Sequence, residues 1–516
     1  MNTILSLVPI LSLLICLMVF KLSASRAGAI SLLFAFVIAF LFFGIDAFGM
    51  SIAIAKGVTL ALFVLLIIWA ALFLYHIVDD FKAIEVINKN IVIFVRDKFV
   101  QFLLISWLFS AMLQGIAGFG VPVIIATPIL ISLGFNPVTS VAAVLIGHSW
   151  SVSFGSMGSS LYTIFLMSGI PLQYLGTAMW IFGTVAMALT GLAVCYLYGG
   201  VKYLLKGLAY VLPVSALMSA SIFVIIQLHM FSLIGLISAL IGLIALYIIY
   251  RFSTSAANKE GVSKLYSSSL TLGQAALPYI SIIVLTLLFQ LLNMGNLAAL
   301  SFSFPGFITE LGHVVNPEPA YSTIRLFGHP APILLTAAAI GALTYKKIGI
   351  WDTSIFKGAV KKTVTRCIPT TISLLCLITM ALIMMDSGMT NELANGTAEI
   401  SGRFYPFFAP LFGVLGSFIT GSNTNSNVLF GQFQYSIART LGVSAAIMCG
   451  SQSIGGSVGV AAGPTTVLMG ATASKLVGQE SLIYKKVFGI TILISLVLGV
   501  LNFILLEVLG LSIGGI

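Results

Sequence analysis

The stretch Gly416–Asn427 reads GSFITGSNTNSN and separates two apolar segments, FFAPLFGVL before it and VLFGQFQ after it. It contains Gly, Ser, Thr and Asn but no charged residue. In hydrocarbon, unpaired backbone groups are so costly that non-helical backbone persists only inside protein or beside a wet cavity. The stretch therefore predicts a broken helix that faces the interior of a membrane protein.

The whole chain has the composition of a polytopic membrane protein. Its 516 residues are 59% hydrophobic and 7% charged, against a soluble level of about 25% charged, and the mean hydropathy is +1.14. Apolar segments recur along the entire length, so we expect one membrane domain over residues 1–516. The basic residues lie in short loops, so the net charge of +10 indicates orientation and not nucleic-acid binding.

Many apolar segments approach the roughly 20 residues that a spanning helix needs. We therefore expect an all-α polytopic membrane protein with 12–14 transmembrane helices. In two regions of the chain, 114–168 and 421–472, the apolar pattern is broken by Gly, Pro, Ser and Asn. The unbroken candidates lie near 3–20, 28–44, 57–78, 99–113, 174–198, 208–228, 231–250, 275–293, 330–345, 367–385, 404–420 and 487–512.

Loop charges give the expected orientation. The loops 79–98 and 346–366 are rich in Lys and Arg and should be cytoplasmic, whereas 386–402 is acidic before Arg403 and should be external. The first apolar run is followed, not preceded, by basic residues, which favours a first transmembrane helix with its N-terminus outside over a signal peptide. We expect the plasma (cell) membrane as the location.

The two broken regions share an order of features. Each has a helix, a Gly-rich break, an amphipathic stretch, an Ala-rich helix and a second Ser/Gly-rich break. Loop charges place the start of unit one (about 99–170) inside and the start of unit two (about 404–475) outside. This pattern predicts two inverted repeats whose broken or re-entrant helices meet near midplane. A shift of 303 residues aligns Gly118 with Gly421, Ala142 with Ala445, Ala143 with Ala446 and Gly147 with Gly450.

Interrupted helices supply an anion site without an intramembrane lysine, because their free N–H groups carry roughly half a positive charge. Gly allows close approach to a ligand, and Ser, Thr and Asn are neutral donors. Helix capping or helix–helix packing through small residues is the alternative reading. The predicted binding residues are Gly118, Phe119, Gly120, Thr420, Gly421, Ser422, Asn423, Thr424, Asn425 and Asn427, with Ser149, Ser151, Gln452, Ser453 and Gly455 on the facing breaks.

Two residues are candidates for proton coupling. His148 lies in the second break of unit one and could carry a proton or only brace the fold. Arg439 could pair with a substrate carboxylate, although snorkelling to an interface is the favoured reading. Asp80 and Asp386 are expected to be solvated at helix ends.

The sequence contains little that indicates an enzyme or a cofactor protein. It has no P-loop, nucleophile elbow or dinucleotide fingerprint, and its five cysteines are scattered without metal-ligand spacing. Glu310, His313 and Glu318 lie in SFSFPGFITELGHVVNPEPA, where Pro and Gly suggest a loop or re-entrant segment, and no HExxH motif is present. We expect no metal and no cofactor.

At these breaks the sequence resembles the L-lactate permease family of secondary transporters. The resemblance is carried by residues 115–146 (GIAGFGVPVIIATPILISLGFNPVTSVAAVLI), FGSMG at 154–158, residues 420–448 (TGSNTNSNVLFGQFQYSIARTLGVSAAIM), SIGGSVG at 453–459 and KLVGQES at 475–481. It implies symport of a short 2-hydroxymonocarboxylate, such as lactate or glycolate, with protons by an alternating-access motion. It also implies that the chain is not an enzyme.

The chain departs from the family pattern at a few positions. Asn423 stands where the family commonly has Asp, and Val460 where it often has Lys; His148-Ser149 and Gln452-Ser453 stand where it has Asn-Thr. Loss of a paired acid and base would be nearly charge-neutral; a changed substrate or coupling ion is the other explanation. A sodium-coupled or differently selective carboxylate transporter and an anion channel therefore remain alternatives. A membrane-embedded enzyme would rest on His148 with Ser149 or Ser151.

Overall fold

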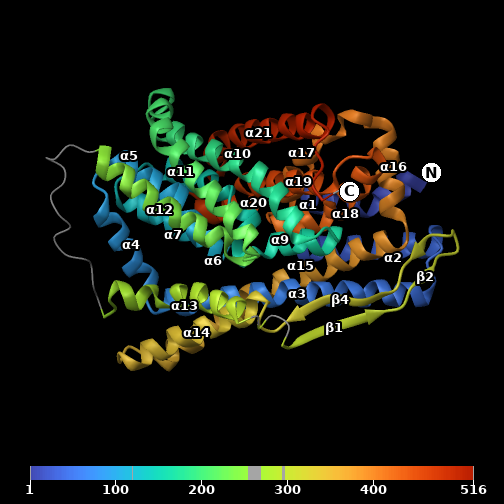
Figure 1. Cartoon of the computed structure of the whole chain (residues 1–516), viewed down its shortest axis with the longest axis horizontal. Helices are drawn as coiled ribbons and strands as arrows, with labels where there is room; N and C mark the ends of the chain where they lie inside the picture. Colours follow the sequence, from blue (N-terminus) through green and yellow to red (C-terminus); the bar gives the residue numbers. More distant parts are fainter. Residues whose placement is uncertain (1, 119, 254–268, 293, 295–296, 515–516) are drawn as a thin grey trace.

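The computed structural model describes residues 2–118, 120–253, 269–292, 294 and 297–514, and it is predominantly helical (Figure 1). In chain order the helices are α1 (Asn2–Met18), α2 (Ala24–Phe42), α3 (Ala47–Asp80), α4 (Ala83–Phe94), α5 (Lys98–Leu103), α6 (Ser110–Ile116), α7 (Val121–Ser132), α8 (Pro137–Ser149), α9 (Gly155–Ser168), α10 (Leu172–Gly199), α11 (Val201–Gln227), α12 (Ile234–Ser253), α13 (Leu272–Leu291), α14 (Pro330–Lys347), α15 (Thr353–Asp386), α16 (Met389–Ser401), α17 (Tyr405–Thr420), α18 (Asn423–Leu441), α19 (Ala445–Gly459), α20 (Pro464–Ala473) and α21 (Glu480–Phe503).

The all-α polytopic class is confirmed, with fewer full-length spans than the 12–14 expected. In the described part of the chain, 9 helices are long and apolar enough to cross a membrane, or up to 11 if each of two bent helix pairs counts as one span. The difference arises at three predicted spans, which form α1 with 17 residues, α14 with 18 and α17 with 16. Helices α1 and α17 are shorter than the other spans, whereas α14 is long enough but less apolar, since its last turn contains Lys346 and Lys347.

Two long helices, α3 and α15, form an antiparallel pair along one side of the molecule (Figure 1). Each has 34 residues, which corresponds to about 51 Å at 1.5 Å per residue. The Trp69 Nε1–H donates to Thr371 Oγ1 over 3.0 Å near the middle of the pair, and Lys362 forms an ion pair with Asp80 at one end. Helix α2 packs on α15 and helix α14 on α3, so the pair is covered on both sides.

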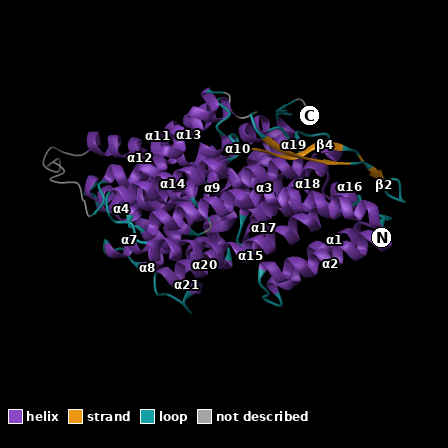
Figure 2. Cartoon of the chain, turned by 90° about the horizontal axis from the view of Figure 1, so that it is seen from below, coloured by secondary structure: helices purple, strands orange, loops and turns teal. Residues whose placement is uncertain are grey.

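The stretch 301–320, expected to be a loop or a re-entrant segment, instead lies within two small antiparallel sheets formed by residues 299–325. Strand β1 (Ala299–Phe304) pairs with β4 (Glu318–Arg325), and β2 (Phe307–Ile308) pairs with β3 (Val314–Val315). Figure 2 shows these strands at the edge of an otherwise helical molecule. The alternating sequence SFSF at 301–304 suits a strand because successive side chains point to opposite faces.

A buried ion cluster joins this hairpin to the long helices and corrects the expectation that Asp386 is solvated. Lys56, in α3, is 1% exposed, and Asp386, the last residue of α15, is 3% exposed. The Lys56 Nζ donates to both oxygens of Asp386, over 3.2 and 3.1 Å, and lies 2.7 Å from Glu318 Oε1 and 5.4 Å from the centroid of the Tyr321 ring. Burial is tolerated because the opposite charges meet directly. Asp80 is also mostly covered, because its side chain is 13% exposed and forms an ion pair with the exposed Lys362, so the expectation that it is solvated is likewise corrected.

Removing one partner of the Lys56–Asp386 pair should destabilise the protein more than removing both. Lys56→Met leaves Asp386 buried without its cation and beside Glu318, which should lower stability by about 3–5 kcal/mol. Adding Asp386→Asn removes the stranded charge and should recover most of that loss. The thermal unfolding midpoints of the three detergent-solubilised proteins measure this difference. A double variant no more stable than the Lys56→Met single variant would contradict the assignment of a coupled pair.

Candidate functional site

The first break of unit one lies between α6 and α7. Gly118 and Gly120 have φ angles of +60° and +79°, which is a conformation that glycine adopts readily. A Cβ atom on Gly118 would lie 1.9 Å from Ser156 Oγ, so the close packing also requires glycine. Pro122 lies in the first turn of α7, as predicted, because its missing N–H needs no partner there. Phe119 lies outside the described residues.

The first break of unit two is the GSNTNSN stretch itself. Helix α17 ends at Thr420, Gly421 has a φ of +69°, and α18 begins at Asn423. Ser422 caps α18, since its Oγ accepts a hydrogen bond from the backbone N–H of Asn425 over 3.4 Å. The polar stretch is thus a helix interruption, and its Asn, Thr and Ser residues form the first turns of the next helix.

The second break of each unit is also visible in the backbone. Helices α8 and α9 are bent by 58° about the 3-10 turn Val152–Phe154, and α19 and α20 by 41° after Val460–Ala462. Ser156, Met157 and Gly158 have positive φ angles of 48°, 54° and 80°, so the regular part of α9 begins at about Ser159. Each unit therefore contains two helices that start in the interior of the molecule.

The helices that follow the breaks pair across the two units. Helix α7 packs on α20, and α9 packs on α18. The Ser160 and Thr424 hydroxyls lie 3.0 Å apart, and Asn427 Nδ2 donates to Ser160 O over 2.9 Å. Asn423 Nδ2 donates to Ser153 Oγ over 2.9 Å. In both pairs, the helix that follows the first break of one unit contacts the helix that follows the second break of the other unit.

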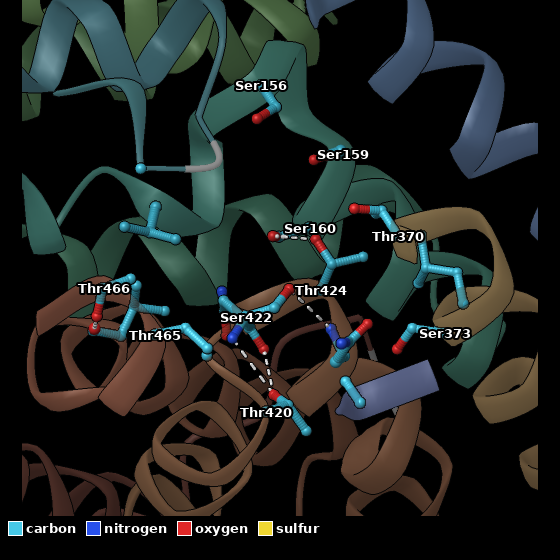
Figure 3. Close-up of a pocket in the computed structure, with 18 of the residues that line it drawn as sticks. Ser156, Ser159, Ser160, Thr370, Ser373, Thr420, Ser422, Thr424, Thr465 and Thr466 are labelled. Carbon is cyan, nitrogen blue, oxygen red and sulfur yellow. Dashed lines mark hydrogen bonds between the residues drawn. The ribbon is translucent and has the colours of Figure 1, made fainter. Parts of the chain in front are cut away.

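These four helix starts converge on one cavity of about 350 Å³. Gly120 contributes from α7, Ser159 and Ser160 from α9, Ser422 to Asn425 from α18, and Thr465 and Thr466 from α20. Figure 3 shows hydroxyl side chains from these helices and from α15 grouped around the same space. The volume lies within the roughly 300–1,000 Å³ typical of small-molecule sites. The positive ends of the four helices favour an anion here.

Arg366 provides the charge in this cavity, and the sequence-based prediction missed it. It was assigned to the cytoplasmic loop 346–366, but α15 already begins at Thr353, so Arg366 is a helical residue. Positions 366, 369, 370, 373 and 374 line the cavity because residues at this spacing share one helix face. Among the described lining residues, Arg366 is the one permanently charged side chain, and there is no Asp, Glu or Lys. The sequence offered one indication that Arg366 is part of a helix, because it lies one residue before the predicted span 367–385.

His148 also lines the cavity and is 2% exposed. Its Nδ1 lies 2.5 Å from the carbonyl oxygen of Val144. A carbonyl can only accept, so Nδ1 carries the hydrogen and Nε2 is the basic atom of the neutral ring. His148 is thus a titratable group in the wall of a cavity that also contains Arg366.

The remaining predicted residues do not all reach the cavity. Gly118, Ser149, Ser151, Asn427, Gln452, Ser453 and Gly455 are buried but are not among the lining residues. Ser153 Oγ donates to Ser453 O over 2.8 Å and Gly455 packs on Pro410, so this layer holds the second breaks together. Arg439 is exposed near the end of α18 and away from the cavity, which supports snorkelling. Ser156, Ser159, Ser160, Thr370, Ser373, Thr465 and Thr466 line it without having been predicted.

Both of the departures that remove a charge from the family pattern lie at the cavity. Asn423 and Val460 are among its lining residues.

In the part of the chain that the structure describes, no three His, Cys, Asp or Glu side chains lie in position to hold a metal ion.

Comparison with known proteins agrees with the resemblance. The family model for L-lactate permease matches residues 2–509. An L-lactate permease of Halalkalibacterium halodurans is 28% identical over 515 residues, which cover 95% of this chain and 94% of that protein. The glycolate permease GlcA of Escherichia coli (strain K12) is 26% identical over 549 residues, covering 97% and 95%.

Among solved structures, the Alcanivorax borkumensis YdaH transporter, described as having an unusual topology, aligns over 90% of both chains with a TM-score of 0.45 and 13% identity. The family match extends over nearly the whole chain, including every helix that reaches the cavity. The chain is a multi-pass membrane protein that belongs to the L-lactate permease family, whose members are transporters and not enzymes.

Proposed function

We propose that this protein is a symporter that moves a short 2-hydroxymonocarboxylate, of the lactate or glycolate type, with protons across the plasma membrane. The observation that carries the proposal is a cavity formed by four helix starts, with one guanidinium and no acidic side chain among its described lining residues. Such a site favours a small monovalent anion. The neighbouring hydroxyl and amide groups are suited to a 2-hydroxyl group.

We further propose that the units 99–170 and 404–475 are inverted repeats and that the N-terminus lies outside. The reciprocal packing of α7 on α20 and of α9 on α18 supports a two-fold relation between the units. In this model the binding residues are those at the breaks, with Gly118 and Gly120 on one side and Thr420 to Asn425 on the other. The buried layer of Ser149, Ser151, Asn427, Gln452, Ser453 and Gly455 positions them.

Proton coupling is assigned to His148 in this proposal. In the neutral ring Nδ1 donates to the Val144 carbonyl, and Nε2 is the atom that accepts a proton. A protonated ring would compensate part of the negative charge that the substrate brings into the membrane. Proton and monocarboxylate would then cross together with little net charge, which avoids the large cost of moving an uncompensated ion through hydrocarbon.

Sodium is the second candidate for the coupling ion, because unpaired oxygen atoms gather near Gly456. Among the described residues, Asn423 Oδ1 and Ser417 Oγ have no hydrogen-bond partner. They lie 2.2 and 3.1 Å from the position that a Cβ atom on Gly456 would take. Neutral oxygens at interrupted helices are the groups that coordinate sodium in other transporters.

Uptake into proteoliposomes with one imposed gradient at a time distinguishes these possibilities. We expect an acidic exterior to drive accumulation of lactate and glycolate, and an inward sodium gradient at equal pH to have no effect. Acceleration by sodium alone would replace the proton assignment with the sodium alternative. Counterflow exchange of labelled substrate should also occur, whereas its absence together with saturable, uncoupled flux would indicate a channel.

The first turn of α18 should be essential for uptake. Asn425 lines the cavity and is 7% exposed, and Asn425→Leu removes its polar group while keeping a similar size. We expect uptake to fall by at least about 10-fold, as for the loss of a hydrogen bond to a charged group. Asn395→Leu on the exposed face of α16 is the matched control and should transport normally. Unchanged affinity in a folded, membrane-inserted Asn425→Leu protein would show that the GSNTNSN site is misassigned.

His148→Asn should separate binding from proton coupling. Asn retains a donor for the Val144 carbonyl but cannot carry a proton at neutral pH. We expect counterflow exchange to persist while stimulation of uptake by an acidic exterior is lost. The control is His329→Asn, because His329 caps α14 and contacts the Phe63 carbonyl outside the cavity. Proton-driven accumulation by the His148→Asn protein would exclude His148 as the coupling residue.

A further inference from the structure

We propose that Arg366 binds the carboxylate of the transported substrate and is the residue that selects acids over their uncharged analogues. This inference rests on the proposed function, since it assumes that the cavity carries a monocarboxylate. It adds a specific ligand to a site that was otherwise predicted from neutral donors at the breaks. Three observations support it independently: the position of the Arg366 side chain, the charge of the cavity, and the location of Arg366 on α15 and not on a broken helix.

The guanidinium lies beside the start of a broken helix. Its Nη2 atom is 3.8 Å from the position that a Cβ atom on Gly120 would occupy, and Gly120 precedes the first turn of α7. The positive end of α7 and the Arg366 charge therefore face the same part of the cavity. Two positive groups this close repel each other, and an anion bound beside both would offset that repulsion.

The charge of the cavity points to an anionic ligand. Arg366 contributes a permanent positive charge, there is no Asp or Glu among the described lining residues, and His148 adds a second positive charge when it carries the coupling proton. A planar guanidinium can bind both oxygens of one carboxylate, whereas Lys can offer only a point charge. A carboxylate thus matches the cavity in the sign of its charge and matches Arg366 in geometry.

The location of Arg366 on α15 also determines which end of the substrate each part of the site contacts. The neutral donors belong to the broken helices, such as Ser422 and Thr424 on α18, whereas Arg366 belongs to the long pair formed by α3 and α15. A substrate held by Arg366 at its carboxylate presents its 2-hydroxyl to the broken helices. The bound molecule would then bridge these two parts of the protein.

The test compares lactate with its uncharged amide, lactamide, as inhibitors of labelled lactate counterflow in proteoliposomes. In the unmodified protein, lactate should inhibit far more strongly than lactamide. In Arg366→Gln, the KM for lactate should rise roughly 10- to 100-fold, the range expected for a lost charge-assisted hydrogen bond. The preference for lactate over lactamide should fall by a similar factor. A role of Arg366 in bracing α15 would not change this preference.

Arg366→Lys and Arg403→Gln provide the controls. Lys retains the charge but not the planar fork, so Arg366→Lys should show an intermediate KM and keep the preference for the acid. It also replaces Arg366→Gln if that variant fails to reach the membrane. Arg403, exposed at the end of α16, should tolerate Gln. An unchanged KM and preference in either folded Arg366 variant would overturn the inference. Failure of the unmodified protein to exchange any 2-hydroxymonocarboxylate would instead refute the proposed function.

Discussion

The structure depends on the need to pair backbone polar groups wherever a helix is interrupted inside the membrane. Four helices begin in the interior, and their first N–H groups have no partner within the helix itself. Ser422 satisfies one of them at α18, and the Ser and Thr hydroxyls of α9 and α20 surround the same space. Because the four starts face one cavity, their positive ends reinforce one another. The same N–H groups that need a partner at each helix start are therefore the groups that would bind an anion.

The rest of the molecule holds these starts in place. Ser153 joins the two units, since its Oγ donates to Ser453 O and accepts from Asn423 Nδ2 at the first break of unit two, and glycines such as Gly118 allow contacts too close for any other residue. On the opposite side, the antiparallel helices α3 and α15 supply a continuous helical wall about 51 Å long. The Lys56–Asp386–Glu318 cluster fixes one end of that wall to the β1–β4 hairpin. The cavity therefore lies between the broken helices on one side and two continuous helices on the other.

The sequence predicted the features that arise from local chemistry. Gly118, Gly120 and Gly421 indicated breaks because glycine tolerates positive φ angles, and the Ser, Thr and Asn residues after Gly421 indicated capping, as Ser422 shows. The spans were also predictable, since apolar runs of about 20 residues have few alternatives. The order of features in the two units correctly anticipated two breaks in each.

Contacts between distant segments could not be predicted in the same way. Lys56 is a single charge in a long apolar run, and its partner Asp386 lies 330 positions away. Arg366 belonged to a run of basic residues that resembles a cytoplasmic loop, but Asp352 caps a helix that begins 13 residues earlier at Thr353. Its presence at the cavity follows from the length of α15, which loop charges do not reveal.

The central claim is tested most directly by a structure of the protein determined with a saturating 2-hydroxymonocarboxylate. We predict that the carboxylate occupies the cavity between Gly120, Arg366 and the first turn of α18, within hydrogen-bonding distance of at least one of the helix starts. Ligand density at another place in the molecule, with this cavity occupied by water alone, would contradict the account.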